Sequence, residues 1–142
     1  MQQTKVAQGI DYYYRFVKKF PSIQILAYAD EEIVLKLWQG LGYYSRARNL
    51  YYSAKQIVKE HQGVFPNKYG EIIKLKGIGN YTAAAISSFA FNLHYAVVDG
   101  NVVRVLSRFF GIEIAFETTN GKKTFENLAN KLLPQKKSSI YN

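Results

Sequence analysis

Two glycines separated by one residue occupy the segment from residue 75 to 83, which reads Leu-Lys-Gly-Ile-Gly-Asn-Tyr-Thr-Ala. Gly77 and Gly79 lie between two stretches with helical patterns, so they predict a tight turn between helices. At such a turn backbone N–H groups can approach a phosphate closely, at the positive end of the following helix. An ordinary glycine corner between helices is the alternative. The flanking Leu75 and Thr82, together with the charge of the chain, favour phosphate binding.

The chain of 142 residues is strongly basic, with 19 lysine and arginine side chains against 10 aspartate and glutamate side chains and a formal net charge of +9. A small domain with this balance favours a polyanionic partner, usually nucleic acid, although the same charge can serve solubility alone. Twelve tyrosines are available to pack, to stack on bases or to donate hydrogen bonds. We therefore expect a nucleic-acid partner.

The sequence contains no cysteine, which excludes disulfides, thiolate zinc sites and iron–sulfur ligation within these residues. No apolar run approaches the roughly 20 residues that span a bilayer, and the polar N-terminal residues do not form a signal peptide. Hydrophobic residues make up 48% of the chain, which is enough for a folded core. We expect a monomer in the cytoplasm, associated with the nucleoid and of bacterial type.

Apolar residues recur at spacings of three and four along most of the chain, which predicts amphipathic helices. The predicted helical segments are residues 6–20, 22–29, 30–38, 47–61, 67–75, 80–91, 100–110 and 122–133, and the last five residues resemble the start of another helix. Residues 95–98 and 112–116 are weak strand candidates. The predicted class is all-α, with residues 1–142 in one helical domain.

Capping residues mark several of these boundaries. Ser22, Asp30 and Asp99 stand where N-caps are expected, and Gly111 stands where a C-cap is expected. Gly40 and Gly42 interrupt the pattern before the long helical segment. The apolar face of that long segment is predicted to consist of Ala47, Leu50, Ala54, Ile57 and Val58.

The segment from residue 75 to 83 resembles the helix-hairpin-helix of DNA glycosylases, with Lys76 where that family usually has proline. A second segment, residues 37–50, reads Leu-Trp-Gln-Gly-Leu-Gly-Tyr-Tyr-Ser-Arg-Ala-Arg-Asn-Leu and resembles MutY-type adenine DNA glycosylases. Residues 2–6 and 97–102 resemble the same family. These segments occur in the family's order and spacing, so the resemblance implies a helix-hairpin-helix DNA glycosylase fold, mainly its hairpin-bearing lobe.

The resemblance implies base-excision repair by a monofunctional glycosylase that hydrolyses the N-glycosidic bond of adenine mispaired with 8-oxoguanine or guanine. Breaking that bond passes through an oxocarbenium-like transition state, which a carboxylate near the sugar stabilises. Asp99 matches the family's catalytic aspartate, although a plain N-cap is the simpler role. Asn101 matches a residue that orients this site, and a plain polar residue in the first helical turn is the alternative. Tyr81 occupies the position where bifunctional relatives have a lysine that forms a Schiff base, which tyrosine cannot form. Helix packing is the alternative role for Tyr81.

The same resemblance implies a set of contacts with duplex DNA that carries an adenine mismatch. A base must leave the stack before it is cut, and Tyr43 is expected to intercalate beside the damaged guanine. A core aromatic is the alternative for Tyr43, but the neighbouring Gly40 and Gly42 favour an exposed loop. Arg46 and Arg48 are expected to contact phosphate or to anchor the core. The other expected DNA contacts are made by Gln2, Gln3, Thr4, Lys76, Gly77, Ile78, Gly79, Asn80 and Thr82.

The resemblance further implies a monovalent cation bound through the backbone carbonyls of Ile73, Leu75 and Ile78. It implies a [4Fe-4S] cluster for the full-length protein, with cysteines beyond Asn142. The family's general acid, a glutamate, precedes Gln2. We therefore expect a fragment truncated at both ends, which by itself does not turn over.

Two other functions remain open. One is a non-catalytic module that binds duplex DNA or the lesion. The other is an endonuclease III-like glycosylase/lyase that acts on oxidised pyrimidines, against which Tyr81 and the segment 37–50 both argue.

Overall fold

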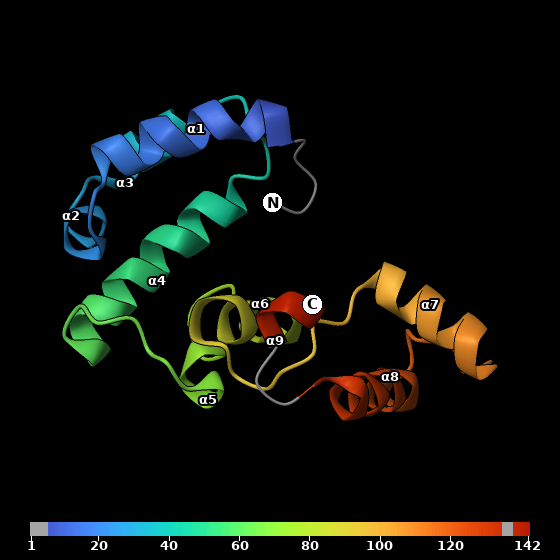
Figure 1. Ribbon diagram of the computed structural model, residues 1–142. Helices are drawn as coiled ribbons and strands as arrows, with labels where there is room; N and C mark the ends of the chain where they lie inside the picture. Colours follow the sequence, from blue (N-terminus) through green and yellow to red (C-terminus); the bar gives the residue numbers. More distant parts are fainter. Residues whose placement is uncertain (1–5, 135–137) are drawn as a thin grey trace. The chain divides into compact units, whose positions relative to one another are not determined.

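The computed structural model describes residues 6–134 and 138–142, and all regular secondary structure in them is helical (Figure 1). The all-α prediction is therefore confirmed. The strand candidates at residues 95–98 and 112–116 are wrong, because both stretches are irregular connections between helices. The chain divides into two compact units. The first contains the residues up to Pro66 and residues 75–77, and the second contains residues 67–74 and 78–142. The expectation of one domain over residues 1–142 stays a prediction.

The first unit contains four helices, α1 (Val6–Lys19), α2 (Ile23–Ala27), α3 (Glu31–Trp38) and α4 (Ser45–His61). The long helix α4 packs against α2 and α3, and α1 packs against α3 (Figure 1). The buried apolar side chains of this core are Phe20, Leu26, Ala27, Val34, Tyr51 and Ala54.

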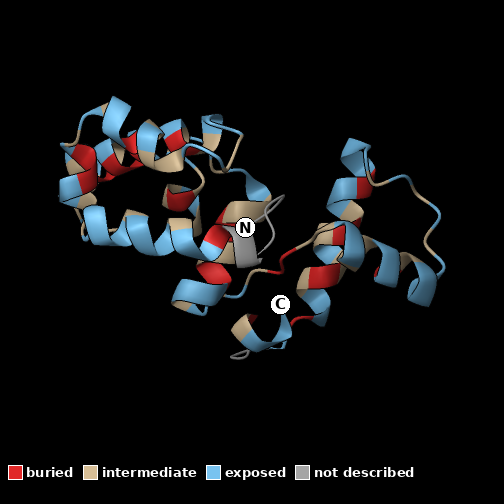
Figure 2. Ribbon diagram, turned by 90° about the horizontal axis from the view of Figure 1, so that it is seen from above, coloured by how far each residue is buried: buried red, intermediate tan, exposed pale blue. Residues whose placement is uncertain are grey.

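The second unit contains α5 (Tyr69–Ile72), α6 (Asn80–Phe91), α7 (Gly100–Phe110), α8 (Thr119–Leu132) and α9 (Ser138–Tyr141). Helix α6 contacts α5 and α9, and α7 contacts α8. The core of this unit consists of Ala96, Leu106, Phe125 and Ala129. In the helices of both units, buried residues occur beside exposed ones, and some irregular segments are buried as well (Figure 2).

Most of the predicted caps are confirmed. The Ser22 hydroxyl accepts a hydrogen bond from the Ile25 N–H at 3.3 Å, and Gly111 ends α7 with a φ of +65°. Asp30 does precede α3, but its side chain makes no capping hydrogen bond. The last long helix begins at Thr119 rather than at residue 122, because the Thr118 hydroxyl accepts the Gly121 N–H at 2.9 Å and so starts the helix earlier.

Helix α4 differs from its predicted apolar face at one position. Leu50 is 41% exposed, whereas Ala47, Tyr51 and Ala54 are buried one turn apart. Ser53 is buried as well, because its hydroxyl donates to the Lys76 carbonyl at 2.7 Å. The buried face is therefore shifted toward Tyr51 and Ser53. Among residues 6–134 and 138–142, no helix is long and apolar enough to cross a membrane.

Candidate functional site

The two glycines of the hairpin turn differ in whether the fold requires glycine at their positions. Gly77 has a φ of +78°, a left-handed conformation that favours glycine, and a Cβ there would collide with the Asn49 side chain. Gly79 has an extended conformation with a φ of −101°, and a Cβ there would meet nothing within 4 Å. The fold therefore requires glycine at position 77. At position 79 it does not, because the space where a side chain would lie is open.

Side chains of helix α4 hold the backbone of the first part of the turn. The Lys76 N–H donates to the Gln56 side-chain oxygen at 3.2 Å, and the Lys76 carbonyl accepts from Ser53. The neighbouring Leu75 is buried. These contacts fix the Lys76 backbone while the residue as a whole stays exposed, so its ammonium group is available to an anion.

The turn leads into α6, where Gly79 is the N-cap and provides no capping side chain. Its carbonyl accepts the Ala83 N–H at 2.8 Å. The first N–H groups of a helix have no intrahelical acceptor, and the helix dipole places partial positive charge there. The first turn of α6, which includes Asn80 and Thr82, is therefore chemically suited to an anionic oxygen.

Asp99 is the N-cap of α7, as the sequence predicts. Its Oδ1 accepts the N–H groups of Asn101 and Val102, both at 2.9 Å. The Asn101 side-chain amide lies 3.4 Å from Oδ2. Two backbone donors thus fix the orientation of a half-buried carboxylate at the positive end of an 11-residue helix.

Tyr43 lies in a glycine-rich loop of the first unit. It has a left-handed φ of 49° and is 62% exposed, and its neighbours Gly40 and Gly42 also have positive φ. The Arg46 guanidinium lies 5.5 Å from the centre of the Tyr43 ring and 5.7 Å from that of Trp38. The indole N–H of Trp38 donates to the Gly42 carbonyl at 3.1 Å. The side chains of Arg46 and Trp38 thus stabilise the loop.

Arg48 has a different environment from Arg46. Its guanidinium forms an ion pair with Glu31 at 3.4 Å, at a largely exposed position. A surface pair of this kind contributes about 0–1 kcal/mol to stability, so an external anion can compete for this arginine.

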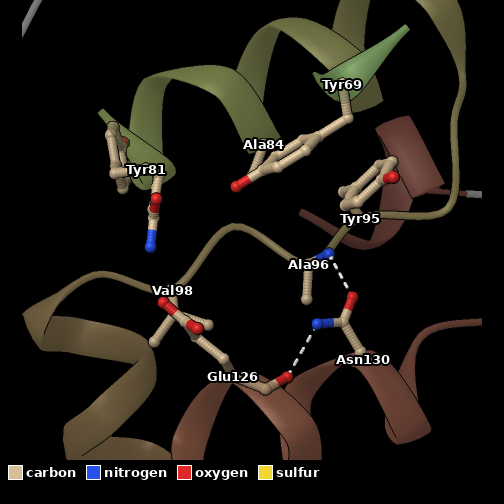
Figure 3. Close-up of a pocket in the computed structure, with 9 residues that line it drawn as sticks. Tyr69, Tyr81, Ala84, Tyr95, Ala96, Val98, Glu126 and Asn130 are labelled. Carbon is tan, nitrogen blue, oxygen red and sulfur yellow. Dashed lines mark hydrogen bonds between the residues drawn. The ribbon is translucent and has the colours of Figure 1, made fainter. Parts of the chain in front are cut away.

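Tyr81 lines a cavity of about 210 Å³ in the second unit. The other side chains drawn there come from α5, α6, α8 and the segment before α7, and Figure 3 shows the Tyr69 hydroxyl and the Glu126 carboxylate pointing into it. Tyr69 and Tyr95 stack with ring centres 4.3 Å apart. Burial, helped by the negative charge of Glu126, raises the pKa of Tyr69 above that of a free tyrosine.

The structure therefore collects the predicted residues in two places. Asn80 and Tyr81 line the same cavity as Val98, which directly precedes Asp99, and all of these belong to the second unit. Tyr43 and Arg46 stack in the first unit. Sequence reasoning missed Tyr69, Tyr95, Glu126 and Asn130 as cavity residues, because no motif or spacing in the sequence connects them.

Three predicted contacts, Gln2, Gln3 and Thr4, lie outside the described residues. Ile73 follows α5, and Leu75 and Ile78 flank Lys76 and Gly77 in the turn. The cation expected at their carbonyls stays a prediction. Within the described part of the chain, no three His, Asp or Glu side chains gather as a metal site. Because all 142 residues lack cysteine, they do not fit a [4Fe-4S] cluster.

The described residues form only helices and irregular segments, with a glycine hairpin turn and a carboxylate at a following helix N-terminus, as expected for a helix-hairpin-helix DNA glycosylase fold. A family model described as HhH-GPD superfamily base excision DNA repair protein matches residues 1–135. The chain belongs to this superfamily.

Relatives within the superfamily are adenine DNA glycosylases. The chain is 52% identical to an adenine DNA glycosylase of Buchnera aphidicola (strain Bp) over 80% of its length and 32% of that protein. It is 43% identical to that of Mus musculus over 100% of its length and 28% of that protein. The chain thus spans about a third of these relatives.

A solved structure of a thermostable thymine-DNA glycosylase is similar with a TM-score of 0.88 and 27% identity, over 99% of this chain and 65% of the other. A trapped endonuclease III–DNA covalent intermediate matches with a TM-score of 0.82 and 24% identity, over 98% and 64%. These similarities confirm the predicted fold.

Proposed function

We propose that the protein containing these residues is a monofunctional DNA glycosylase that removes adenine mispaired with 8-oxoguanine or guanine. The observation that carries the proposal is the similarity to proteins named adenine DNA glycosylase over 80 to 100% of the chain. The net charge of +9 and the exposed hairpin turn support duplex DNA as the partner.

In this proposal the hairpin holds the DNA backbone. The open space at Gly79 and the uncapped first turn of α6 accept a phosphate, and Lys76, three residues before Gly79 in the sequence, contributes a cation. Ile78, Asn80 and Thr82 belong to the same contact, and Gly77 shapes the turn. The exposed Tyr43 ring enters the base stack, with Arg46 bracing it and Arg48 near phosphate.

The carboxylate of Asp99 faces the sugar from which adenine departs. As the C–N bond breaks, positive charge grows on the sugar ring, and an ionised carboxylate stabilises it. The two backbone N–H groups that bind Oδ1 orient the Asp99 carboxylate, and Asn101 assists at Oδ2. Water then completes the hydrolysis, because Tyr81 offers no amine for a Schiff base.

The test is single-turnover incubation of the full-length gene product with a duplex carrying adenine opposite 8-oxoguanine, followed by alkali to reveal abasic sites. Asp99→Asn is the decisive variant, because asparagine caps a helix as well as aspartate but carries no charge. We expect it to slow excision at least about 100-fold while the fold and DNA affinity persist. A matched duplex with adenine opposite thymine is the control substrate.

Each other outcome selects a different function. DNA binding without excision would identify a non-catalytic binding module. Strand cleavage with efficient borohydride trapping would identify a glycosylase/lyase and contradict the role given to Tyr81. The same assay on residues 1–142 tests the expectation that these residues alone do not excise adenine.

A further inference from the structure

The irregular segment that leads into Asp99 is buried and depends on side chains for its hydrogen bonds. Ala96 and Val97 are only 7% and 8% exposed, and neither lies in a helix. Buried backbone N–H groups require acceptors, because leaving one unpaired costs about 1–3 kcal/mol. Two asparagines supply them, one in α8 and one directly after α9. The Ala96 N–H donates to Asn130 Oδ1 and the Val97 N–H donates to Asn142 Oδ1, both at 2.9 Å.

Asn130 is held within α8 while it binds this segment. Its side-chain amide donates to the Glu126 carbonyl, one turn earlier in the helix, at 2.8 Å. Figure 3 shows both hydrogen bonds at the edge of the cavity lined by Tyr69 and Tyr81. Asn130 therefore joins α8 directly to the segment three residues before Asp99.

Asn142 contacts the segment from a second side. Its side-chain nitrogen lies 3.0 Å from the Tyr95 carbonyl, 2.9 Å from the Ser138 carbonyl and 2.7 Å from the Ser88 hydroxyl. Its Oδ1 meanwhile accepts from Val97. One amide thus binds the segment at Tyr95 and Val97 and joins it to α6 and α9.

We propose that Asn130 and Asn142 are positioning residues that determine where the Asp99 carboxylate lies. The inference rests on the proposed function, in which Asp99 faces the reacting sugar. The cap hydrogen bonds to Asn101 and Val102 fix the carboxylate relative to α7 only. The two asparagines fix the entry to α7 relative to α6, α8 and α9. Because a displacement of about 1 Å can cost about 100-fold in rate, this second constraint matters for chemistry.

Amide hydrogen exchange of the 142-residue chain, followed by NMR, tests how the segment before Asp99 is held. This test makes no assumption about catalysis. In Asn130→Ala or Asn142→Ala, we expect the protection of the amides of Ala96 or Val97 to fall about tenfold, the effect of one net hydrogen bond. The matched control is Asn127→Ala, an exposed asparagine on the same helix as Asn130.

A conservative variant keeps the test informative if an alanine variant does not fold. Asn130→Asp keeps an oxygen acceptor for the Ala96 N–H and loses only the donor to Glu126, so it should restore most of the protection. Unchanged exchange at Ala96 in folded Asn130→Ala and at Val97 in folded Asn142→Ala would overturn the proposal, as would a failure of Asn130→Asp to differ from Asn130→Ala.

The catalytic consequence is measured in the excision assay. We expect Asn130→Ala and Asn142→Ala to lower the single-turnover rate about 100-fold with little change in DNA affinity, and Asn130→Asp to recover most of the rate. Equal losses of rate and affinity would indicate a merely structural role and overturn the proposal, as would an unchanged rate. If the unaltered protein excises no adenine, the proposed function fails, and the exchange experiment still decides whether the asparagines hold the segment that leads into Asp99.

Discussion

The two oxygens of Asp99 have different surroundings. Oδ1 accepts two backbone N–H groups at 2.9 Å, whereas the partner of Oδ2 among the described residues is the Asn101 side-chain amide at 3.4 Å. A capping role therefore uses one oxygen and leaves the other less constrained. Capping and charge stabilisation are compatible in one side chain, because the helix needs an acceptor and the reaction needs a negative charge.

The hairpin glycines give the first prediction at this scale. Gly79→Ser should retain or raise stability, because serine is a preferred N-cap and nothing lies within 4 Å of its Cβ. The same change should weaken duplex DNA binding, since the new side chain fills the space proposed for a phosphate. Gly77→Ser should instead lower the unfolding free energy by about 1–2 kcal/mol, because its φ is +78°.

Urea denaturation and fluorescence anisotropy with a labelled duplex measure the two effects separately. Weakened binding of Gly79→Ser with an intact unfolding curve would support the phosphate contact. If Gly79→Ser binds as tightly as the original chain, the contact lies elsewhere.

Tyr69 gives a prediction about pH. Burial raises the pKa of its hydroxyl, so the folded state keeps a proton that the unfolded state releases at high pH. The stabilising contribution is complete below the unfolded pKa of about 10 and is lost as pH rises toward the folded pKa. When the pH rises from 8 to above about 10, the free energy of unfolding of Tyr69→Phe should therefore fall less than that of the original chain. Urea unfolding at both pH values measures this, with Tyr28→Phe, at an 80% exposed position, as the control. Equal alkaline losses in both variants would contradict it.

At the scale of the element, the helix boundaries that the sequence predicts are those with a local cause. Ser22, Asp99 and Gly111 act within three or four residues of their own positions, and each cap is confirmed. The exposure of Leu50 could not be predicted in this way. Which face of α4 is buried depends on the contacts of α4 with α2, α3 and the Lys76 carbonyl, and helical spacing alone allows either choice.

The segment before Asp99 shows the same limit for the candidate site. Its apolar composition suggests a strand, yet its N–H groups bond to asparagines 34 and 45 residues away in sequence. Nothing in the spacing of Asn130 or Asn142 indicates these partners. The sequence therefore predicts Asp99 and its cap, but not the side chains that hold the segment in front of it.

Helix α8 provides a prediction in which packing opposes intrinsic propensity. Alanine is a better helix former than glycine by about 1 kcal/mol, so Gly121→Ala would stabilise an isolated helix. In the folded chain the new Cβ would collide with the Ala115 carbonyl, and backbone cannot yield as a flexible side chain can. We expect Gly121→Ala to lower the unfolding free energy by about 1–3 kcal/mol. The control is Gly70→Ala in α5, where nothing lies within 4 Å. Thermal unfolding that ranks Gly121→Ala above Gly70→Ala would contradict the prediction.

At the scale of the molecule, each unit has its own core and carries part of the candidate site. Tyr43 and Arg46 belong to the unit built around Tyr51, whereas Tyr81 and Asp99 belong to the unit built around Phe125. The proposed wedge and the proposed carboxylate are therefore supported by separate sets of packing contacts. A substitution that loosens one core should first affect the function of the residues in that unit.

The net charge of +9 leads to the last prediction, which concerns binding to duplex DNA. Each phosphate neutralised by a basic side chain releases condensed counterions, so the logarithm of affinity should fall linearly with the logarithm of salt, with a slope of about −0.9 per contact. With 6–10 contacts, the loss between 50 and 200 mM salt is about 10³–10⁵-fold, and with fewer contacts it is proportionally smaller on the logarithmic scale. Affinity should depend little on base sequence in undamaged duplexes, because phosphate contacts carry no sequence information.

Lys76→Gln should reduce the magnitude of the slope by about one unit. Lys36→Gln, which removes the same charge from an exposed position on α3, should reduce it less. Fluorescence anisotropy titrations at four salt concentrations determine these slopes. A slope near zero would exclude the phosphate-binding role of the hairpin, and equal changes in the two variants would show that the total charge, rather than the hairpin, determines binding.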